Sequence, residues 1–172
     1  DTWVSLSDRS RLAVKHKGDL FVSIHVNASP KPEVSGLETY YLDLAGTKDS
    51  VRLAAVENAG SNRGLGEMEE ILADMLLDSR MQESRRLASS VQTQTLAQLK
   101  KRGQPAKSGG TKGAPFHVLI GSSMPGVLVE VGYCTNAAEA KRLRQSAYRD
   151  ALAEGIANGV HHYARQLETA AK

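Results

Sequence analysis

An alternation of apolar and polar positions over residues 19–28 predicts a β-strand. The second face of this segment begins with Phe21 and continues with Ser23 and His25, whereas the first face is wholly apolar, with Leu20, Val22, Ile24 and Val26. Strands of a parallel sheet that is covered on both faces have this composition. We therefore predict a central strand that ends near His25 and Asn27, where ligands bind in open α/β sheets.

A second strand is predicted over residues 126–132, and it carries a carboxylate. Glu130 shares a face with Leu128, while the opposite face consists of Val127, Val129 and Val131. Because an unpaired charge in such a strand is costly, Glu130 requires a compensating group. His25 and Glu130 form the candidate functional pair. The alternatives are a core histidine and a buried structural ion pair.

The remaining pattern alternates helices with strands. Apolar spacing, capping residues and glycines predict helices over residues 5–17, 50–58, 67–78, 79–102, 136–143 and 146–167. Further strands are predicted over 36–42 and 116–120, and residues 103–115, rich in Gly, Lys and Pro, predict a surface loop. This order predicts an α/β fold, a three-layer αβα sandwich around a mostly parallel sheet. Residues 50–78 form a separable helical module.

Length, charge and cysteine content limit the classes of protein to which this sequence can belong. The 172 residues, 41% of them hydrophobic, predict one compact domain. The net charge is +3, and the short basic clusters at 100–102 and 141–144 are typical of solvated helix faces, so nucleic acid is not an expected partner. Cys134 is the single cysteine, which excludes an internal disulfide. The sequence has no apolar run of about 18 residues, so no membrane span is expected.

Three motifs follow one another along the chain: Phe21–Ala28, Gly36–Leu42, and Met124–Gly132 with Thr135 and Asn136. In this order they resemble the zinc-dependent N-acetylmuramoyl-L-alanine amidases of the AmiA/AmiB/AmiC type, the Amidase_3 family. The resemblance implies a phosphorylase/hydrolase-like fold and a Zn²⁺ cofactor. It implies that zinc-activated water cleaves the amide bond between N-acetylmuramic acid and L-alanine of peptidoglycan. It also implies a role in cell separation, in the periplasm or otherwise exported in a bacterium.

The resemblance assigns roles to residues of both strands. In the resembled family, the residue at the place of His25 is a zinc ligand, and the residue at the place of Glu130 is the catalytic carboxylate that passes a proton to the leaving amine. Asn27 either forms the turn after its strand or lines the substrate groove. A rival mechanism pairs a nucleophilic Cys134 with His25. Because nothing near Cys134 indicates an activated thiolate, we expect a buried, inert thiol.

One departure from the family bears on activity. The family's other two zinc ligands are a histidine in a Gly-His-Gly segment and a glutamate on the next helix. Both precede the family position that corresponds to residue 1 of this sequence. We therefore expect residues 1–172 to be a catalytic domain that lacks its N-terminal strand and helix, and to be inactive alone. His161 and His162 project about 100° apart on a helix and are poorly placed to replace these ligands. The alternative is a peptidoglycan-binding fragment with an incomplete metal site.

The helical module at residues 50–78 resembles an insertion of the cell-division amidases. That insertion lies over the active site and places a glutamate on the zinc until a LytM-type activator displaces it. Glu57 is the first candidate for this contact and Glu70 the second; a carboxylate at the open position excludes the water that the reaction needs. The alternative is an ordinary surface helix. The module would dock through an apolar face of Met68, Ile71, Leu72 and Met75.

Overall fold

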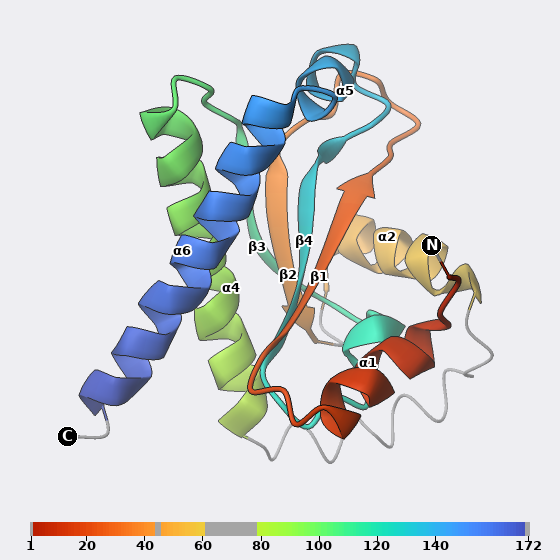
Figure 1. The fold of residues 1–172 in the computed structure, drawn as a ribbon. Helices are drawn as coiled ribbons and strands as arrows, with labels where there is room; N and C mark the ends of the chain where they lie inside the picture. The colour runs from red at the N-terminus through yellow and green to blue at the C-terminus, as the bar shows by residue number, and fades with distance from the viewer. Residues whose placement is uncertain (1, 44–45, 61–78, 171–172) are drawn as a thin grey trace. The chain divides into compact units, whose positions relative to one another are not determined.

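The computed structural model describes residues 2–43, 46–60 and 79–170, over which helices and strands alternate (Figure 1). The elements, in chain order, are α1 (Leu6–Lys15), β1 (Phe21–Asn27), β2 (Leu37–Leu42), α2 (Lys48–Glu57), η1 (Asn58–Gly60), α4 (Ser79–Lys101), β3 (Ser108–Ala114), η2 (His117–Leu119), β4 (Gly126–Tyr133), α5 (Ala137–Leu143) and α6 (Ser146–Ala170). Most of the predicted helices are therefore confirmed.

The strands form one four-stranded sheet in the order β1-β4-β2-β3. Backbone bonds at the ends of β1 and β4 make this pair parallel: Phe21 N–H donates to Pro125 O at 3.0 Å, and Cys134 N–H donates to Asn27 O at 2.8 Å. The bond from Leu37 N–H to Lys107 O begins an equally parallel pairing of β2 with β3. Figure 1 draws β2 opposite in direction to β4, so the sheet is mixed. The predicted α/β fold with a mostly parallel sheet is confirmed.

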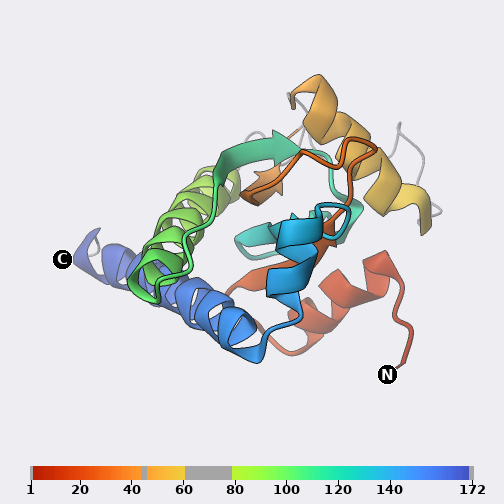
Figure 2. The ribbon, with the colours of Figure 1, turned by 90° about the horizontal axis from the view of Figure 1, so that it is seen from above.

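The chain divides by its internal contacts into two compact units. The first consists of Asp1–Ser23, Tyr40–Arg85 and Lys112–Leu128, and the second of Ile24–Thr39, Arg86–Thr111 and Val129–Lys172. An apolar cluster fills the first unit; it contains Tyr40, Leu42, Ala54, Ala114, Phe116, Val118, Leu119, Ile120 and Leu128. The second unit contains α5, α6 and most of α4, and α4 and α6 lie side by side in both ribbon views (Figures 1 and 2).

Two glycines let α6 approach α4 closely. A Cβ atom at Gly155 would lie 2.7 Å from Thr95 Cα, and one at Gly159 would lie 2.5 Å from Val91 Cα. Real side chains do not tolerate such distances to backbone atoms. Ser90 Oγ adds a bond by donating to the Gly159 carbonyl at 2.8 Å. The two helices therefore form a rigid pair within the second unit.

Three local predictions are wrong. Within the described sheet β1 is an end strand rather than a central one, and Ile24 and Val26 are 58% and 48% exposed. The expected loop contains β3, because Gly109 leaves room for the Glu38 side chain on the neighbouring strand. Residues His117–Leu119 are buried as expected, but they form a 3₁₀ turn instead of a strand.

The predicted module over residues 50–78 is described only in part. Its first half is α2 and η1, while Glu70 and the expected amphipathic helix from residue 67 lie outside the described residues. The assignment of residues 1–172 to one catalytic domain stays a prediction. No described helix combines the length and the hydropathy that a membrane crossing requires.

Candidate functional site

His25 and Glu130 lie on neighbouring strands at the same level. The bonds that join the ends of β1 and β4 set a parallel register in which position 25 lies beside position 130. His25 is half-buried and shares the inner face of β1 with the buried Ser23 and Asn27. Glu130 is fully buried at 0% exposure. The two strands therefore bring an imidazole and a buried carboxylate together, as the sequence predicts.

Glu57 is the last residue of α2, and its neighbour Asn58 fixes that end of the helix. Asn58 Nδ2 donates to Pro115 O at 2.8 Å, and Asn58 Oδ1 accepts from His117 N–H at 2.8 Å. At the other end of α2, Ser50 Oγ donates to Gly113 O at 3.0 Å. The two ends of α2 are thus bonded to β3 and to the segment that follows it, which holds the Glu57 backbone in place.

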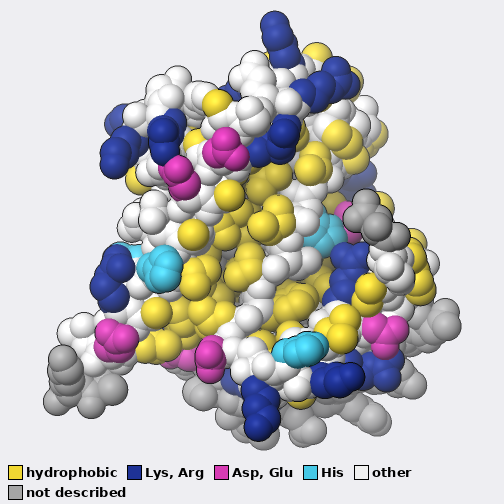
Figure 3. Space-filling view, in the orientation of Figure 1, with side chains coloured by type: hydrophobic (Ala, Val, Ile, Leu, Met, Phe, Trp, Pro, Cys, Tyr) yellow, Lys and Arg dark blue, Asp and Glu magenta, His cyan; other side chains and the backbone are white. Residues whose placement is uncertain are grey.

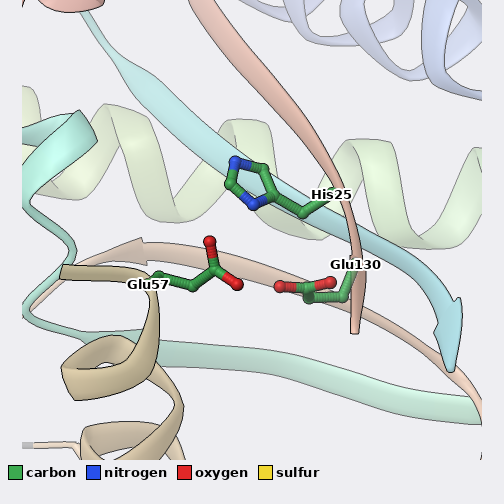
Figure 4. Close-up of side chains that lie close together, drawn as sticks. All are labelled: His25, Glu57 and Glu130. Atoms are coloured by element: carbon green, nitrogen blue, oxygen red, sulfur yellow. The ribbon is translucent and has the colours of Figure 1, made fainter. Parts of the chain in front are cut away.

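The side chains of His25, Glu57 and Glu130 point toward one another (Figure 4). One ligand atom from each, an imidazole nitrogen and two carboxylate oxygens, lies within 4.8 Å of the others. A nitrogen and two oxygens suit Zn²⁺, whose protein ligands lie at roughly 2.0–2.2 Å from the ion. A cation here would also offset the charge of Glu130, whose strand is otherwise apolar. These residues therefore fit a divalent metal ion.

Asn27 ends β1 with its side chain turned inward. Its Oδ1 accepts a hydrogen bond from Ala28 N–H at 2.7 Å, and the residue is 2% exposed. This bond is typical of an asparagine that forms a turn. A role of Asn27 in lining the substrate groove stays a prediction.

The buried Tyr133 lies within the electrostatic influence of three carboxylates, one of which is Glu130. The Tyr133 hydroxyl donates to the Glu38 carboxylate, and burial, followed by the negative charge of Glu38, raises the pKa of Tyr133 well above its usual range. Glu130 and Glu139 act in the same direction. The negative potential of these groups favours cation binding in this part of the second unit.

Glu38 belongs to the strand predicted over residues 36–42, and its burial is a finding of the structure. Glu38 is only 6% exposed, because β2 is buried on both faces along most of its length. The available signal was the near-continuous apolar and aromatic run of Leu37–Leu42, which is typical of a strand covered on both sides.

The other reactive candidates lie apart from this group. Cys134 is exposed, which corrects the expectation of a buried thiol. His162 Nδ1 lies 3.0 Å from Ser90 Oγ on α4, and His161 is exposed on α6. Neither histidine belongs to the metal-binding group found among the described residues.

Comparisons with known proteins point to one family. A family model described as N-acetylmuramoyl-L-alanine amidase matches residues 1–162. The N-acetylmuramoyl-L-alanine amidase LytC of Bacillus subtilis is 33% identical over 165 residues, which are 96% of this chain and 25% of LytC. The amidase AmiA of Escherichia coli is 30% identical over 168 residues, 95% of this chain and 58% of AmiA. The chain thus spans well under two thirds of either relative.

A solved structure shares the fold. The N-acetylmuramoyl-L-alanine amidase from Clostridium difficile 630 superposes with a TM-score of 0.66 at 29% identity, over 96% of this chain and 68% of that one.

Proposed function

Because the chain belongs to the N-acetylmuramoyl-L-alanine amidase family, we propose that its protein hydrolyses the amide bond between N-acetylmuramic acid and L-alanine in peptidoglycan. The observation that carries the proposal is the convergence of His25, Glu57 and Glu130. A buried carboxylate beside an imidazole provides what amide hydrolysis needs, a proton acceptor next to a metal ligand.

We propose Zn²⁺ as the cofactor, with His25 as a ligand through one ring nitrogen of its neutral imidazole. Bound zinc would supply a Lewis acid that polarises the scissile carbonyl and makes water easier to deprotonate. We propose that a further histidine and a further glutamate complete the ligand set in the intact protein, as the resemblance implies. Glu57 would block the open coordination site, a role supported by the approach of its carboxylate to His25 and Glu130.

Glu130 carries the proton in the proposed reaction. Its carboxylate accepts a proton from the attacking water as the oxygen bonds to the lactyl carbonyl carbon. It then gives that proton to the alanine nitrogen, and the carbon–nitrogen bond breaks. The products are a lactyl carboxylate on the muramic acid and a stem peptide with a free L-alanine amine. Burial of Glu130 keeps bulk water from exchanging the proton during the cycle.

The test uses the complete protein and soluble muropeptides. Wild type should release stem peptides with a free L-alanine amine, while Glu130→Gln should release them at least 10³-fold more slowly, by order of magnitude for lost general-base catalysis. Glu154→Gln removes an exposed carboxylate on α6 and should match wild type. Metal analysis should show bound zinc in all three proteins. Unchanged turnover in Glu130→Gln would falsify its role.

The rival candidate, a catalytically incompetent peptidoglycan-binding fragment, is distinguished in the same assay. It predicts muropeptide binding without amine release and without stoichiometric zinc in the complete protein.

We further propose that the enzyme is autoinhibited and acts outside the cytoplasm in cell separation. Glu57 supports the first point because its carboxylate lies among the groups that would bind the metal. A LytM-type activator would then have to displace the end of α2. Peptidoglycan as substrate requires export, to the periplasm in a bacterium with an outer membrane.

A further inference from the structure

The loop between β1 and β2, residues 28–36, is bonded along its length to the turn that follows β4. Ser29 N–H donates to Thr135 Oγ1 at 3.0 Å, and Asn136 Nδ2 donates to Pro32 O at 2.9 Å. We call residues 28–36 the rim loop. Because the rim loop and this turn belong to the same compact unit, the bonds fix the loop relative to the strands of His25 and Glu130.

Glu139 completes this attachment from a buried position on α5. It is 3% exposed, and its two carboxylate oxygens accept from two backbone donors, Gly36 N–H at 3.0 Å and Tyr133 N–H at 2.7 Å. Arg142 Nη2 lies 3.4 Å from Oε1 and offsets the charge. Hydrogen bonds to an ionised carboxylate are about twice as strong as neutral ones. Glu139 therefore joins the end of the rim loop to the end of β4.

The rim loop begins within reach of a bound stem peptide. It follows Asn27 directly, and a strand rises about 3.3 Å per residue, so the loop starts roughly 7–10 Å beyond His25. An extended peptide advances about 3.5 Å per residue. When the amide of the first stem residue lies between His25 and Glu130, the second and third stem residues can extend to this loop.

Lys31 gives the rim loop a cation in a restrained position. It lies between Pro30 and Pro32, which limits its backbone, and its N–H donates to Ser29 Oγ at 3.1 Å. Lys31 is exposed, and its ammonium forms no ion pair with any described residue. Figure 3 shows Lys and Arg side chains gathered at the end of the molecule where Figure 1 places α5. Peptidoglycan stems carry free carboxylates after the first residue, so the charges are complementary.

We propose that the rim loop is a subsite for the second and third residues of the stem peptide, that Lys31 binds a stem carboxylate, and that Glu139 is the positioning residue of the loop. The proposal rests on the proposed amidase function and adds the part of the substrate that the enzyme recognises beyond the cleaved bond.

The first test compares two substrates of the complete, zinc-loaded protein, N-acetylmuramoyl-L-alanine and N-acetylmuramoyl tripeptide. Lys31→Gln should raise KM for the tripeptide substrate about fivefold, the size of one exposed ion pair, and leave kcat and the short substrate unchanged. Lys101→Gln, an exposed lysine at the end of α4, is the matched control and should match wild type. Equal KM values for Lys31→Gln and wild type on the tripeptide substrate would overturn the role of Lys31.

The second test addresses Glu139. Glu139→Gln keeps the size of the side chain but leaves one backbone N–H without its acceptor, and should raise KM about tenfold for the tripeptide substrate alone. Glu154→Gln is the control. A purely structural role would change both substrates equally and would contradict the proposal. If Glu139→Gln does not fold, Thr135→Val removes only the bond to Ser29 from an exposed position and should show the same selectivity.

Binding of the free stem tripeptide, measured by calorimetry, separates this inference from the proposed function. Weaker tripeptide binding by Lys31→Gln than by wild type supports the subsite even if wild type cleaves neither substrate. The absence of cleavage would then contradict only the amidase activity. Unchanged tripeptide binding by Lys31→Gln and Glu139→Gln, in a wild type that cleaves both substrates, would overturn the subsite and leave the amidase activity standing.

Discussion

At the scale of single residues, Tyr133 reports on the carboxylates that surround Glu130. Its pKa is raised in the folded protein by burial and by Glu38, so the folded state keeps a proton that the unfolded chain releases near its ordinary value of 10.0. The resulting stability is fully present below about pH 10 and is lost as the pH rises further. We expect the free energy of unfolding to fall less steeply above pH 10 in Tyr133→Phe than in wild type. Urea titrations between pH 9 and 11 measure both slopes, and parallel curves would contradict the assignment.

Residue chemistry explains which site residues the sequence could reveal. His25 and Glu130 could be identified because a polar side chain in an otherwise apolar strand needs a compensating partner or a function. This mismatch is visible within the sequence of each strand. Glu139 was not identified from the sequence as a site residue, since its bond to Gly36 joins it to a loop about a hundred residues earlier in the chain. Exposure of Cys134 likewise depends on the turn that follows β4, which strand periodicity does not specify.

At the scale of elements, the contact between α4 and α6 makes a sharp prediction. Gly159→Ala would place a Cβ atom 2.5 Å from Val91 Cα, so the helices must separate. We expect this substitution to destabilise the protein by about 1–3 kcal/mol, although alanine is the better helix former. Asn158→Ala changes the adjacent exposed position and should be neutral or slightly stabilising. Urea unfolding of both variants decides the point, and equal stabilities would show that the helices can shift at little cost.

The end of α2 carries the prediction of autoinhibition. Glu57→Ala should raise the basal amidase activity of the complete protein several-fold, because the metal site would then stay open to water. Asn58→Ala should raise it as well, since it removes both bonds that hold the end of α2. Val56→Ala, at a 66% exposed position of the same helix, is the control. Muropeptide turnover without activator is the measurement, and a flat response in both variants would remove Glu57 from the mechanism.

Elements were easier to predict where periodicity was strong. The helices α4 and α6 begin at Ser79 and Ser146 as predicted, because their long amphipathic patterns leave few alternatives. The strand β3 was missed because three of its seven residues are glycine, a composition typical of loops. In the structure Gly109 and Gly113 leave room for the side chains of Glu38 and Asp43, a tertiary reason that local propensity does not contain.

At the scale of the whole molecule, the predicted central position of β1 was wrong. An apolar face in the sequence does not show whether another part of the chain packs against that face. The periodicity of Ile24 and Val26 predicts burial, yet both are about half exposed in the described part of the chain. The sheet order and the meeting of His25, Glu57 and Glu130 depend on pairings between segments far apart in sequence. The family resemblance supplied the role of Glu57, which neither periodicity nor composition indicates.

Because those three residues are far apart in the sequence, metal binding should stabilise the fold of the whole protein. Residues 25, 57 and 130 belong to segments that are separated in the unfolded chain, so an ion held at the site that they form, with Glu130 beside it as the proton acceptor, binds the folded state almost exclusively. Zinc at 1,000 times its dissociation constant would then stabilise the fold by about 4 kcal/mol. For a chain of this size that corresponds to roughly 10 °C in Tm. We expect a chelator to lower the Tm of the complete protein by about this amount and added zinc to restore it. His25→Ala should show a smaller shift, because it lacks the imidazole ligand. A chelator effect of the same size in His25→Ala and wild type would place the metal elsewhere in the protein.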